Sequence, residues 1–311
     1  MTRFAIPGGG KKLAERARII RAVRAFFESR GFLEVETPAI VPSPGMDLHL
    51  DAYAVEGGFL ITSPEYQMKR LLADGHDRIF QVCRCFRRGE KGAHHNPEFT
   101  MVEWYRGNDG VESVIADTEQ LVAAISGGTF RVGEKVVQAQ PPFARLTVCE
   151  AFERFAGVKE DDVLAWASGD EDRYFRTWVE TVEPRIAEID RAVFVVDYPA
   201  SQASLARKKP SDPRFCERFE LYVAGVELCN GFGELTDAKE QRARFEADQA
   251  ARAARNLPVY PIDEKFMQAV ERLSPCAGNA LGLDRLVALA CGPNETNLDI
   301  REVLAFSADD V

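Results

Sequence analysis

The sequence feature that most constrains the fold is a polar loop, FRRGEKGAHHNPEFT at residues 86–100, set between two apolar segments. The segments IFQVCRCF before it and FTMVEWYR after it contain the β-branched and aromatic residues typical of buried strands. They are predicted to pair as a long antiparallel hairpin with the polar loop at its tip. Because side chains alternate along a strand, one face of the second strand carries Phe99, Met101, Glu103 and Tyr105.

Glu103 makes this hairpin a candidate functional site. Its sequence neighbours are Val102 and Trp104, and Met101 and Tyr105 flank them. A buried carboxylate is costly unless a cation or a hydrogen-bond donor meets it. An exposed hairpin with a charged tip is the commoner structure for such a sequence, but it gives no reason for Glu103 to stand among apolar residues.

The rest of the chain mixes helices and strands without a simple βαβ order. Apolar residues recur at helical spacing over 11–30, and Gly31 follows as a stop signal. Further strands are predicted over 32–41 and 53–62, and further helices over 63–75, 113–126, 237–255 and 263–273. Since strands outnumber βαβ crossovers, a mostly antiparallel sheet flanked by helices is favoured, which is an α+β fold.

Three other segments have a distinct pattern. FELYVAGVELCNGF at 219–232 is predicted to be a hairpin that turns at Ala224-Gly225 and places Glu220, Tyr222 and Glu227 on one face. The segment 277–292 is predicted to be a glycine-rich turn followed by an apolar helix. The charged stretch 157–190 is predicted to be a helical surface insertion with a solvated acidic face.

Composition limits the class of protein only broadly. The chain has 311 residues, 46% of them hydrophobic, which suffices for one large domain or two ordinary ones. A formal net charge of −10 disfavours non-specific binding to nucleic acid or anionic membranes. The seven scattered cysteines contain no C-x-x-C pair, so reduced thiols and a cytoplasmic protein are expected. No apolar run has the length of a signal peptide or a membrane span.

Three segments resemble the signature motifs of the class II aminoacyl-tRNA synthetases. GFLEVETPAIVP (31–42) resembles motif 1, FRRGEKGAHHNPEFTMVEWYR (86–106) resembles the lysine-type motif 2, and GNALGLDRLVAL (278–289) resembles motif 3. They occur in the family's order, and the resemblance covers nearly the whole chain from Lys11 onward. It implies a class II catalytic domain over residues 11–311, after a flexible N-terminus at residues 1–10.

Further segments are similar to a family of lysyl-tRNA synthetase paralogues, the elongation factor P lysine ligases. These segments are LITSPEYQMKRLLADG (60–75), YPASQASLA (198–206) and ELCNGFGELTDAKEQ (227–241). The similarity implies ATP-dependent activation of (R)-β-lysine, and poorly of α-lysine, as an adenylate that is transferred to a lysine ε-amine of elongation factor P. About ten residues precede the first predicted helix, so no OB-fold for binding a tRNA anticodon is expected.

The resemblance also implies a nucleotide site. Adenylate formation needs positioned positive charge on phosphoryl oxygens, which arginines and Mg²⁺ supply. By resemblance, Arg87 contacts the α-phosphate and the substrate carboxylate, Phe99 stacks on adenine, and Arg285 faces the other side of the base and reaches the γ-phosphate. The other implied ATP-binding residues are His95, Gly282 and Glu227, and Glu227 also holds Mg²⁺. A salt bridge for the charged residues and core packing for Phe99 are the alternatives.

The implied amino-acid pocket is rich in carboxylates. Its members by resemblance are Ser63, Glu65, Glu103, Tyr105, Asn230, Glu234 and Ala280. Several carboxylates in one small pocket repel each other unless a cation is present, so the pocket is expected to select a substrate with two ammonium groups. Lysine and β-lysine are such substrates.

Two positions depart from the synthetase pattern. Motif 2 begins with Arg-x-Glu in the family, but here Gly89 stands at the glutamate position and Glu90 follows it. Either Glu90 takes over the contact with the adenine amino group, or that contact is lost. Ala280 stands where lysyl-tRNA synthetases have glycine and the ligase paralogues have alanine. One methyl group discriminates by only ~1–3 kcal/mol, so Ala280 is expected to favour (R)-β-lysine without excluding α-lysine.

Two other functions remain open. One is a truncated lysyl-type synthetase that charges tRNA or a small molecule. The other is a catalytically silent paralogue that binds ATP or an amino acid and regulates another protein, although such a protein would be expected to have lost motif residues. The motif 1 resemblance further implies a C2 homodimer, with the first helix and EVETPAI (34–40) at the two-fold axis.

Overall fold

The computed structural model describes residues 9–292 and 298–310. Most of the predicted flexible N-terminus lies outside the described residues, and the first helix, α1 (Gly9–Glu28), already includes Gly9 and Gly10. Helix α1 buries Ile19, Val23 and Phe27, as the apolar spacing predicts.

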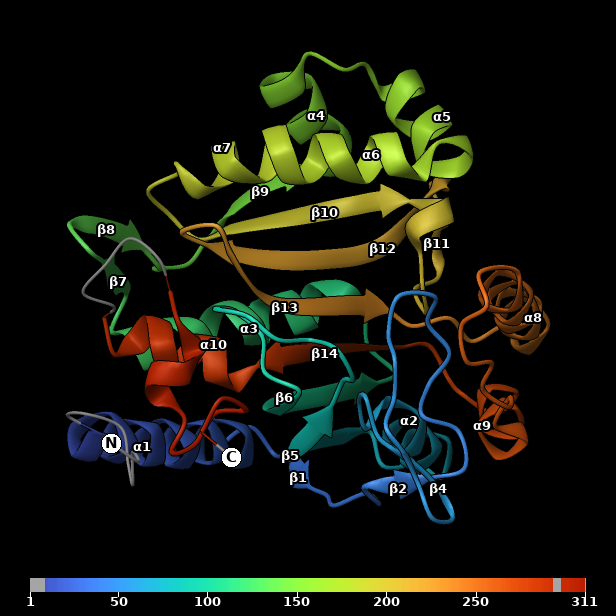
Figure 1. Ribbon diagram of the computed structural model, residues 1–311, viewed down its shortest axis with the longest axis horizontal. Coiled ribbons are helices and arrows are strands. Elements are labelled where there is room, and N and C mark those ends of the chain that lie inside the picture. The colour runs from blue at the N-terminus through green and yellow to red at the C-terminus, as the bar shows by residue number, and fades with distance from the viewer. Residues whose placement is uncertain (1–8, 293–297, 311) are drawn as a thin grey trace.

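A nine-stranded sheet runs through the centre of the molecule (Figure 1). The strand order is β1-β5-β6-β14-β13-β12-β10-β9, and β11 pairs with β12. The pairs β1–β5 and β9–β10 are parallel and the others are antiparallel, which confirms the predicted α+β fold with a mostly antiparallel sheet. The strands are β1 (Leu33–Glu34), β5 (Arg78–Phe86), β6 (Glu98–Gly107), β9 (Ala144–Thr147), β10 (Val193–Pro199), β11 (Lys208–Lys209), β12 (Asp212–Val223), β13 (Val226–Gly233) and β14 (Cys276–Gly282).

One face of the sheet is closed by three helices. Helix α1, α3 (Val111–Ser126) and α10 (Leu283–Ala290) cover it. The largest hydrophobic cluster fills the space between them and includes Phe27, Phe80, Trp104, Leu121 and Leu286. Polar ligands are therefore excluded from this face.

The opposite face is covered only at its two ends. At one end, α2 (Glu65–Ala73) packs Met68 and Leu72 against Ile79 and Tyr105. At the other end lie α4 (Val148–Ala156), α5 (Glu160–Gly169), α6 (Glu171–Thr177), the π-helix η1 (Trp178–Val182) and α7 (Glu183–Ala187), which stack above β9 and β10 in Figure 1. Between the two ends, the middle of this face is open for a site.

The stretch 157–190 is helical, and it also contributes to the core. Tyr174 and Trp178 are buried against Phe152 of α4 and next to Tyr222 of β12. Its acidic first turn at Glu160 faces solvent. That the stretch is an insertion stays a prediction.

Three strand predictions need correction. The predicted strand 32–41 is split into β1 and β2 (Ile40–Val41), and Pro38, which the sequence places at a strand edge or boundary because it lacks a ladder donor, lies between them. The predicted strand 53–62 is a hairpin of β3 (Ala54–Val55) and β4 (Gly58–Leu60). The predicted turn within 277–292 is wrong, because residues 276–282 form β14 in the middle of the large sheet.

The glycines of β14 have a packing role. A Cβ atom at Gly278 would lie 2.2 Å from the ring of Tyr105 on the neighbouring strand β6. Only glycine therefore lets the Tyr105 ring lie flat across β14. The segment lacks β-branched and aromatic residues because its neighbours supply the bulk.

The remaining elements lie around this centre. They are β7 (Thr129–Val132), β8 (Lys135–Gln138), α8 (Ala238–Ala254), α9 (Glu264–Val270), and the 3₁₀ helices η2 (Ala200–Gln202) and η3 (Ile300–Val303). Within 9–292 and 298–310, no helix combines the length and the apolar character needed to cross a membrane.

Candidate active site

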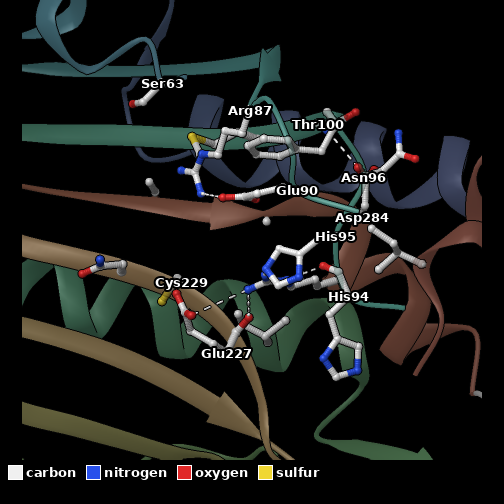
Figure 2. A pocket seen from close by; sticks show the side chains of 18 of the residues that line it. Ser63, Arg87, Glu90, His94, His95, Asn96, Thr100, Glu227, Cys229 and Asp284 are labelled. Carbon is white, nitrogen blue, oxygen red and sulfur yellow. Dashed lines mark hydrogen bonds and ion pairs between the residues drawn. The ribbon is translucent and has the colours of Figure 1, made fainter. Parts of the chain in front are cut away.

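A pocket opens over the middle of the uncovered sheet face (Figure 2). Most of the residues predicted from the sequence line it: Ser63, Glu65, Arg87, Glu90, His95, Phe99, Glu227, Asn230, Ala280, Gly282 and Arg285. Glu103, Tyr105 and Glu234 do not line it, because they are buried close to it. The pocket thus brings together residues that are far apart in the sequence.

The register of the sheet explains this convergence. One row of paired residues crosses five adjacent strands, β12, β13, β14, β6 and β5. From strand to strand, its members are Glu220, Asn230, Ala280, Glu103 and Gln81. Residues paired in this way point to the same face, so these five side chains form one row on the floor of the site. If any of these strands shifted by one residue, its side chain in this row would point to the opposite face of the sheet, into the hydrophobic core.

Arg285 is fixed at one end of the pocket. Its guanidinium donates from Nη1 to the carbonyl of Glu227 (2.7 Å) and from Nε to the carbonyl of His94 (3.2 Å), and its Nη2 lies 2.8 Å from Nε2 of His95. Burial, together with the charge of Arg285, lowers the pKa of both histidines. The neutral His95 ring can therefore accept a hydrogen bond from the arginine.

A buried ion pair positions the helix that carries Arg285. Asp284, which is almost fully buried, accepts a hydrogen bond from the backbone of Thr100 (2.8 Å) and pairs with Arg16 of α1 (2.6 Å). Arg16 also donates to the hydroxyl of Thr100 (2.8 Å). These contacts join α1, β6 and α10 next to the pocket, and the sequence motifs do not point to Arg16.

Arg87 points toward Glu90 in the same pocket (Figure 2). Its guanidinium carbon is 5.1 Å from the centre of the Phe99 ring, and its Nη1 is 3.7 Å from the Glu90 carboxylate. Its Nε donates to the carbonyl of Thr62 at 3.3 Å. Arg87 therefore has weak partners only, and its charge remains available to an anionic ligand in the pocket.

The carboxylate of Glu227 lies 3.8 Å from Arg285 and is close enough to Glu220 to be affected by its charge. Burial, and then the charge of Glu220, raises the pKa of Glu227 to about 7, against the opposing effect of Arg285. Glu220 is itself held by the hydroxyl of Tyr222 (2.7 Å) and by Arg218 (2.7 Å). A pair of oxygen ligands whose charges repel suits a hard divalent cation. The sequence places Glu220 on the same face as Glu227, but the prediction assigned it no role.

Near the other end of the pocket, the Glu103 carboxylate is held by two hydrogen bonds. Its two oxygens accept hydrogen bonds from the hydroxyls of Ser63 (2.7 Å) and Tyr105 (2.6 Å). Burial, and then the charge of Glu65, raises the pKa of Glu103 to about 8. The side-chain oxygen of Asn230, which lines the pocket and is separated from Glu103 by Ala280 in the sheet row, has no hydrogen-bond partner within the described residues. This end therefore offers acceptor oxygens to donor groups of a substrate.

The structure adds a residue that the sequence prediction missed. Lys69, with 1% of its side chain exposed, lies 2.5 Å from Glu234 and 2.6 Å from Glu65. Burial alone would lower the pKa of Lys69, but Glu234 and Glu65 outweigh it and raise that pKa above the usual lysine value. The carboxylates of Glu65, Glu103 and Glu234 and the ammonium of Lys69 thus form one cluster. When all three carboxylates are ionised, the net charge of this cluster is −2.

Comparisons with known proteins agree with this arrangement. The sequence profile of the family described as tRNA synthetases class II (D, K and N) matches residues 7–310. Proteins named elongation factor P–(R)-beta-lysine ligase are similar to the chain: that of Klebsiella pneumoniae (strain 342) is 41% identical, that of Pectobacterium carotovorum (strain PC1) 43% and that of Salmonella dublin 39%. In each case the match covers 96% of this chain and 95% of the relative. The chain therefore belongs to the class II tRNA synthetase family and, within it, to the branch of the elongation factor P–(R)-β-lysine ligases.

Proposed function

We propose that this protein is an ATP-dependent ligase that activates (R)-β-lysine, and α-lysine poorly, as an adenylate and transfers it to a lysine ε-amine of elongation factor P. The observation that carries the proposal is one pocket with two arginines at one end, of which Arg87 is only weakly paired, and an excess of carboxylates at the other end. The names of the relatives support elongation factor P as the acceptor.

In the first step, ATP lies at the end of the pocket formed by Arg87, Phe99 and Arg285. The substrate carboxylate attacks the α-phosphorus, a P–O bond forms, and the bond to pyrophosphate breaks. Arg87 stabilises the charge that develops on the phosphoryl oxygens, and Arg285, held by His95, orients the polyphosphate. The Phe99 ring stacks on adenine, Gly282 leaves room for the nucleotide, and Glu90 accepts from the adenine amino group.

Glu227 and Glu220 fit Mg²⁺, because they are adjacent acidic oxygen ligands whose repulsion a cation relieves. When bound, Mg²⁺ neutralises phosphate charge. Within the described residues, no group of three or more His, Cys, Asp or Glu side chains could hold a metal ion. The remaining ligands would therefore have to come from the nucleotide and water.

In the second step, the acceptor ε-amine loses a proton and attacks the carbonyl carbon of the adenylate. A C–N bond forms, the C–O bond to AMP breaks, and the nitrogen releases a second proton to solvent. The amine must be deprotonated first, so transfer is expected to accelerate as the pH rises toward the amine pKa.

The two ammonium groups of the amino acid match the carboxylate end of the pocket. This end is lined by Ser63, Glu65, Asn230 and Ala280, and Glu103, Tyr105 and Glu234 are buried close to it. After pairing with Lys69, the three carboxylates retain two negative charges when ionised, which two substrate ammonium groups neutralise. The substrate carboxylate then points toward Arg87.

Glu103 makes substrate binding depend on pH. Because its pKa is about 8, Glu103 is mostly protonated at pH 7 when the site is empty. A substrate ammonium group binds the ionised form of Glu103. The KM for β-lysine in pyrophosphate exchange is therefore expected to fall about tenfold between pH 7 and pH 9. Glu103→Gln should abolish this dependence. A KM that is flat with pH in the unmodified protein would contradict the role of Glu103.

Ala280 is expected to set the choice between the two lysine isomers. It lies between Asn230 and Glu103 in the row of the sheet, so its methyl group projects into the site. Ala280→Gly should increase the ratio of kcat/KM for α-lysine to that for β-lysine by roughly 10- to 100-fold. Because the ratio is taken within one protein, partial unfolding does not affect it. An unchanged ratio would remove Ala280 from the specificity argument.

Two assays separate the alternatives. A truncated synthetase would aminoacylate bulk tRNA or a small molecule, and a silent regulatory paralogue would show no diamine-dependent pyrophosphate exchange. The weakly paired guanidinium of Arg87 favours an active enzyme, because a purely structural arginine would have closer partners. The side-chain oxygen of Asn230, which has no hydrogen-bond partner in the described part of the chain, points the same way.

Further parts of the proposal concern assembly and location. The edge strand β1 and strand β2 expose 53% of Leu33 and 53% of Ile40, which fits a C2 homodimer through α1 and residues 34–40. All seven cysteines are free thiols, which fits a cytoplasmic protein. Residues 11–311 are proposed to act as one catalytic domain.

A further inference from the structure

A second cleft adjoins the reaction pocket. It lies between the loop 46–50, α6, η2 and α8, and it holds about 290 Å³ of space. Asp47 and Ser204 line both this cleft and the reaction pocket. The two hollows therefore meet at these two residues.

The loop that separates them is held rigidly by one arginine. Arg252 of α8 is fully buried and donates to the carbonyls of Asp47 (2.7 Å) and Leu50 (2.9 Å) and to the carboxylate of Asp51 (2.5 Å). Its guanidinium also lies 4.6 Å from the ring centre of Tyr260. The backbone of Asp47 is thus held by a preformed framework, and its carboxylate accepts a hydrogen bond from the backbone N–H of His49 (2.7 Å).

The cleft has uncompensated negative charge. Asp248 lies one turn before Arg252 on α8, and neither it nor Asp47 has an ion-pair partner in the described part of the chain. The two arginines that line the cleft are already paired, Arg218 with Glu220 (2.7 Å) and Arg244 with Glu240 (2.7 Å). Burial, and then the charge of Asp47, raises the pKa of Asp248 to about 6.

A buried amide provides an independent sign of a missing ligand. Gln241 lines the same cleft with 1% of its surface exposed. Neither its side-chain nitrogen nor its side-chain oxygen has a partner within residues 9–292 and 298–310. Leaving such groups unpaired is unfavourable, so the cleft is complete only with a polar occupant.

The chemistry of the reaction requires a way in for the acceptor. In the proposed reaction, ATP and the amino acid occupy the reaction pocket between Arg285 and Glu65. The side of this pocket that borders Asp47 and Ser204 leads into the second cleft. The incoming group is a lysine side chain, which is a long apolar stem with an ammonium at its end. Leu48, Phe175 and Phe245 offer apolar contact to the stem, and Asp47 and Asp248 offer charge to the ammonium.

We propose that this cleft is the entrance for the protein acceptor, whose target lysine passes Asp248 and then Asp47 to reach the adenylate. This inference rests on the proposed function and adds the site that binds the second substrate. It predicts that the cleft is needed for transfer to a protein and is not needed for forming the adenylate.

Asp248→Asn and Asp248→Lys test the inference, because Asp248 lines the cleft and not the reaction pocket. The matched control is Glu246→Gln, which removes one negative charge from an exposed position of the same helix. Three rates are measured for each protein: β-lysine-dependent pyrophosphate exchange, trapping of the adenylate by hydroxylamine, and transfer to elongation factor P at varied concentration. Thermal melting establishes that each variant is folded.

Both Asp248 variants are expected to retain exchange and hydroxylamine trapping within about twofold of the unmodified protein. The KM for elongation factor P should rise about tenfold for Asp248→Asn and further for Asp248→Lys, and should not change for Glu246→Gln. A folded Asp248→Lys protein with an unchanged KM for elongation factor P overturns the inference. Absence of exchange in the unmodified protein contradicts the proposed function instead, so the two failures are distinguishable.

Discussion

Arg87→Ala is expected to reduce β-lysine-dependent pyrophosphate exchange by about 10³-fold. One donor aimed at developing charge in a closed site contributes about 3–4 kcal/mol to the transition state. Arg87 has this opportunity because its own contacts are weak, with Thr62 at 3.3 Å and Glu90 at 3.7 Å. Arg87→Lys should recover only part of the rate, since an ammonium cannot make the paired contacts of a guanidinium.

The same weak contacts predict little effect on stability, so Arg87→Ala should melt within a few degrees of the unmodified protein. Arg88→Ala is the matched control, because Arg88 is half exposed and pairs with Asp51 (2.9 Å). It should retain most of its exchange activity. If Arg87→Ala keeps more than about a tenth of the exchange rate, the phosphate-contact role of Arg87 is wrong.

Lys69→Met is expected to lower the free energy of unfolding by about 3–5 kcal/mol at pH 8. The change leaves Glu65 and Glu234 without the ammonium that lies 2.6 Å and 2.5 Å from them. The expected effect is large because Glu234 is almost fully buried, so water cannot replace the lost ammonium as a partner of its carboxylate. Denaturant unfolding monitored at fixed pH measures the difference.

The pH dependence of this deficit has a definite sign. Burial raises the pKa of Glu234 to about 7 even with Lys69 present, and removing Lys69 raises it further, because Lys69 opposes that rise. A carboxyl group whose pKa is raised in the folded state destabilises the fold when it ionises, so the deficit is largest above pH 7 and shrinks toward pH 5.

Lys208→Met provides the control for Lys69→Met, because Lys208 is half exposed and pairs with Glu240 at 3.1 Å. An exposed pair of this kind contributes at most about 1 kcal/mol. Equal losses of stability for the two variants, or a Lys69→Met deficit that grows as the pH falls, would contradict the buried countercharge.

The sequence predicted most reliably which site residues share one face of a strand, because side chains alternate along a strand. The face that carries Phe99 and Glu103, and the face that carries Glu220 and Glu227, both follow from a period of two and are confirmed by the pairing register. Strand β14 could not be predicted in this way, because its glycines and alanines carry no strand preference. Its conformation is imposed by β6 and β13 on either side.

Lys69 and Asp248 were missed for a different reason. Lys69 follows Glu65 by four residues on an amphipathic helix, a spacing typical of exposed helical pairs. Only the packing of α2 against the sheet brings Lys69 to Glu234, which directly follows β13, and so completes a buried triad. Likewise, the approach of Asp248 to Asp47 depends on the contacts of Arg252 with a loop that is remote in sequence.

The most direct test of the central claim is the intact mass of elongation factor P after incubation with this protein, ATP, Mg²⁺ and either (R)-β-lysine or α-lysine. The account predicts the addition of a single lysyl mass, in higher yield with β-lysine. No mass change, in a sample whose diamine-dependent pyrophosphate exchange is intact, would contradict elongation factor P as the acceptor and leave tRNA or a small molecule as the substrate of the second step.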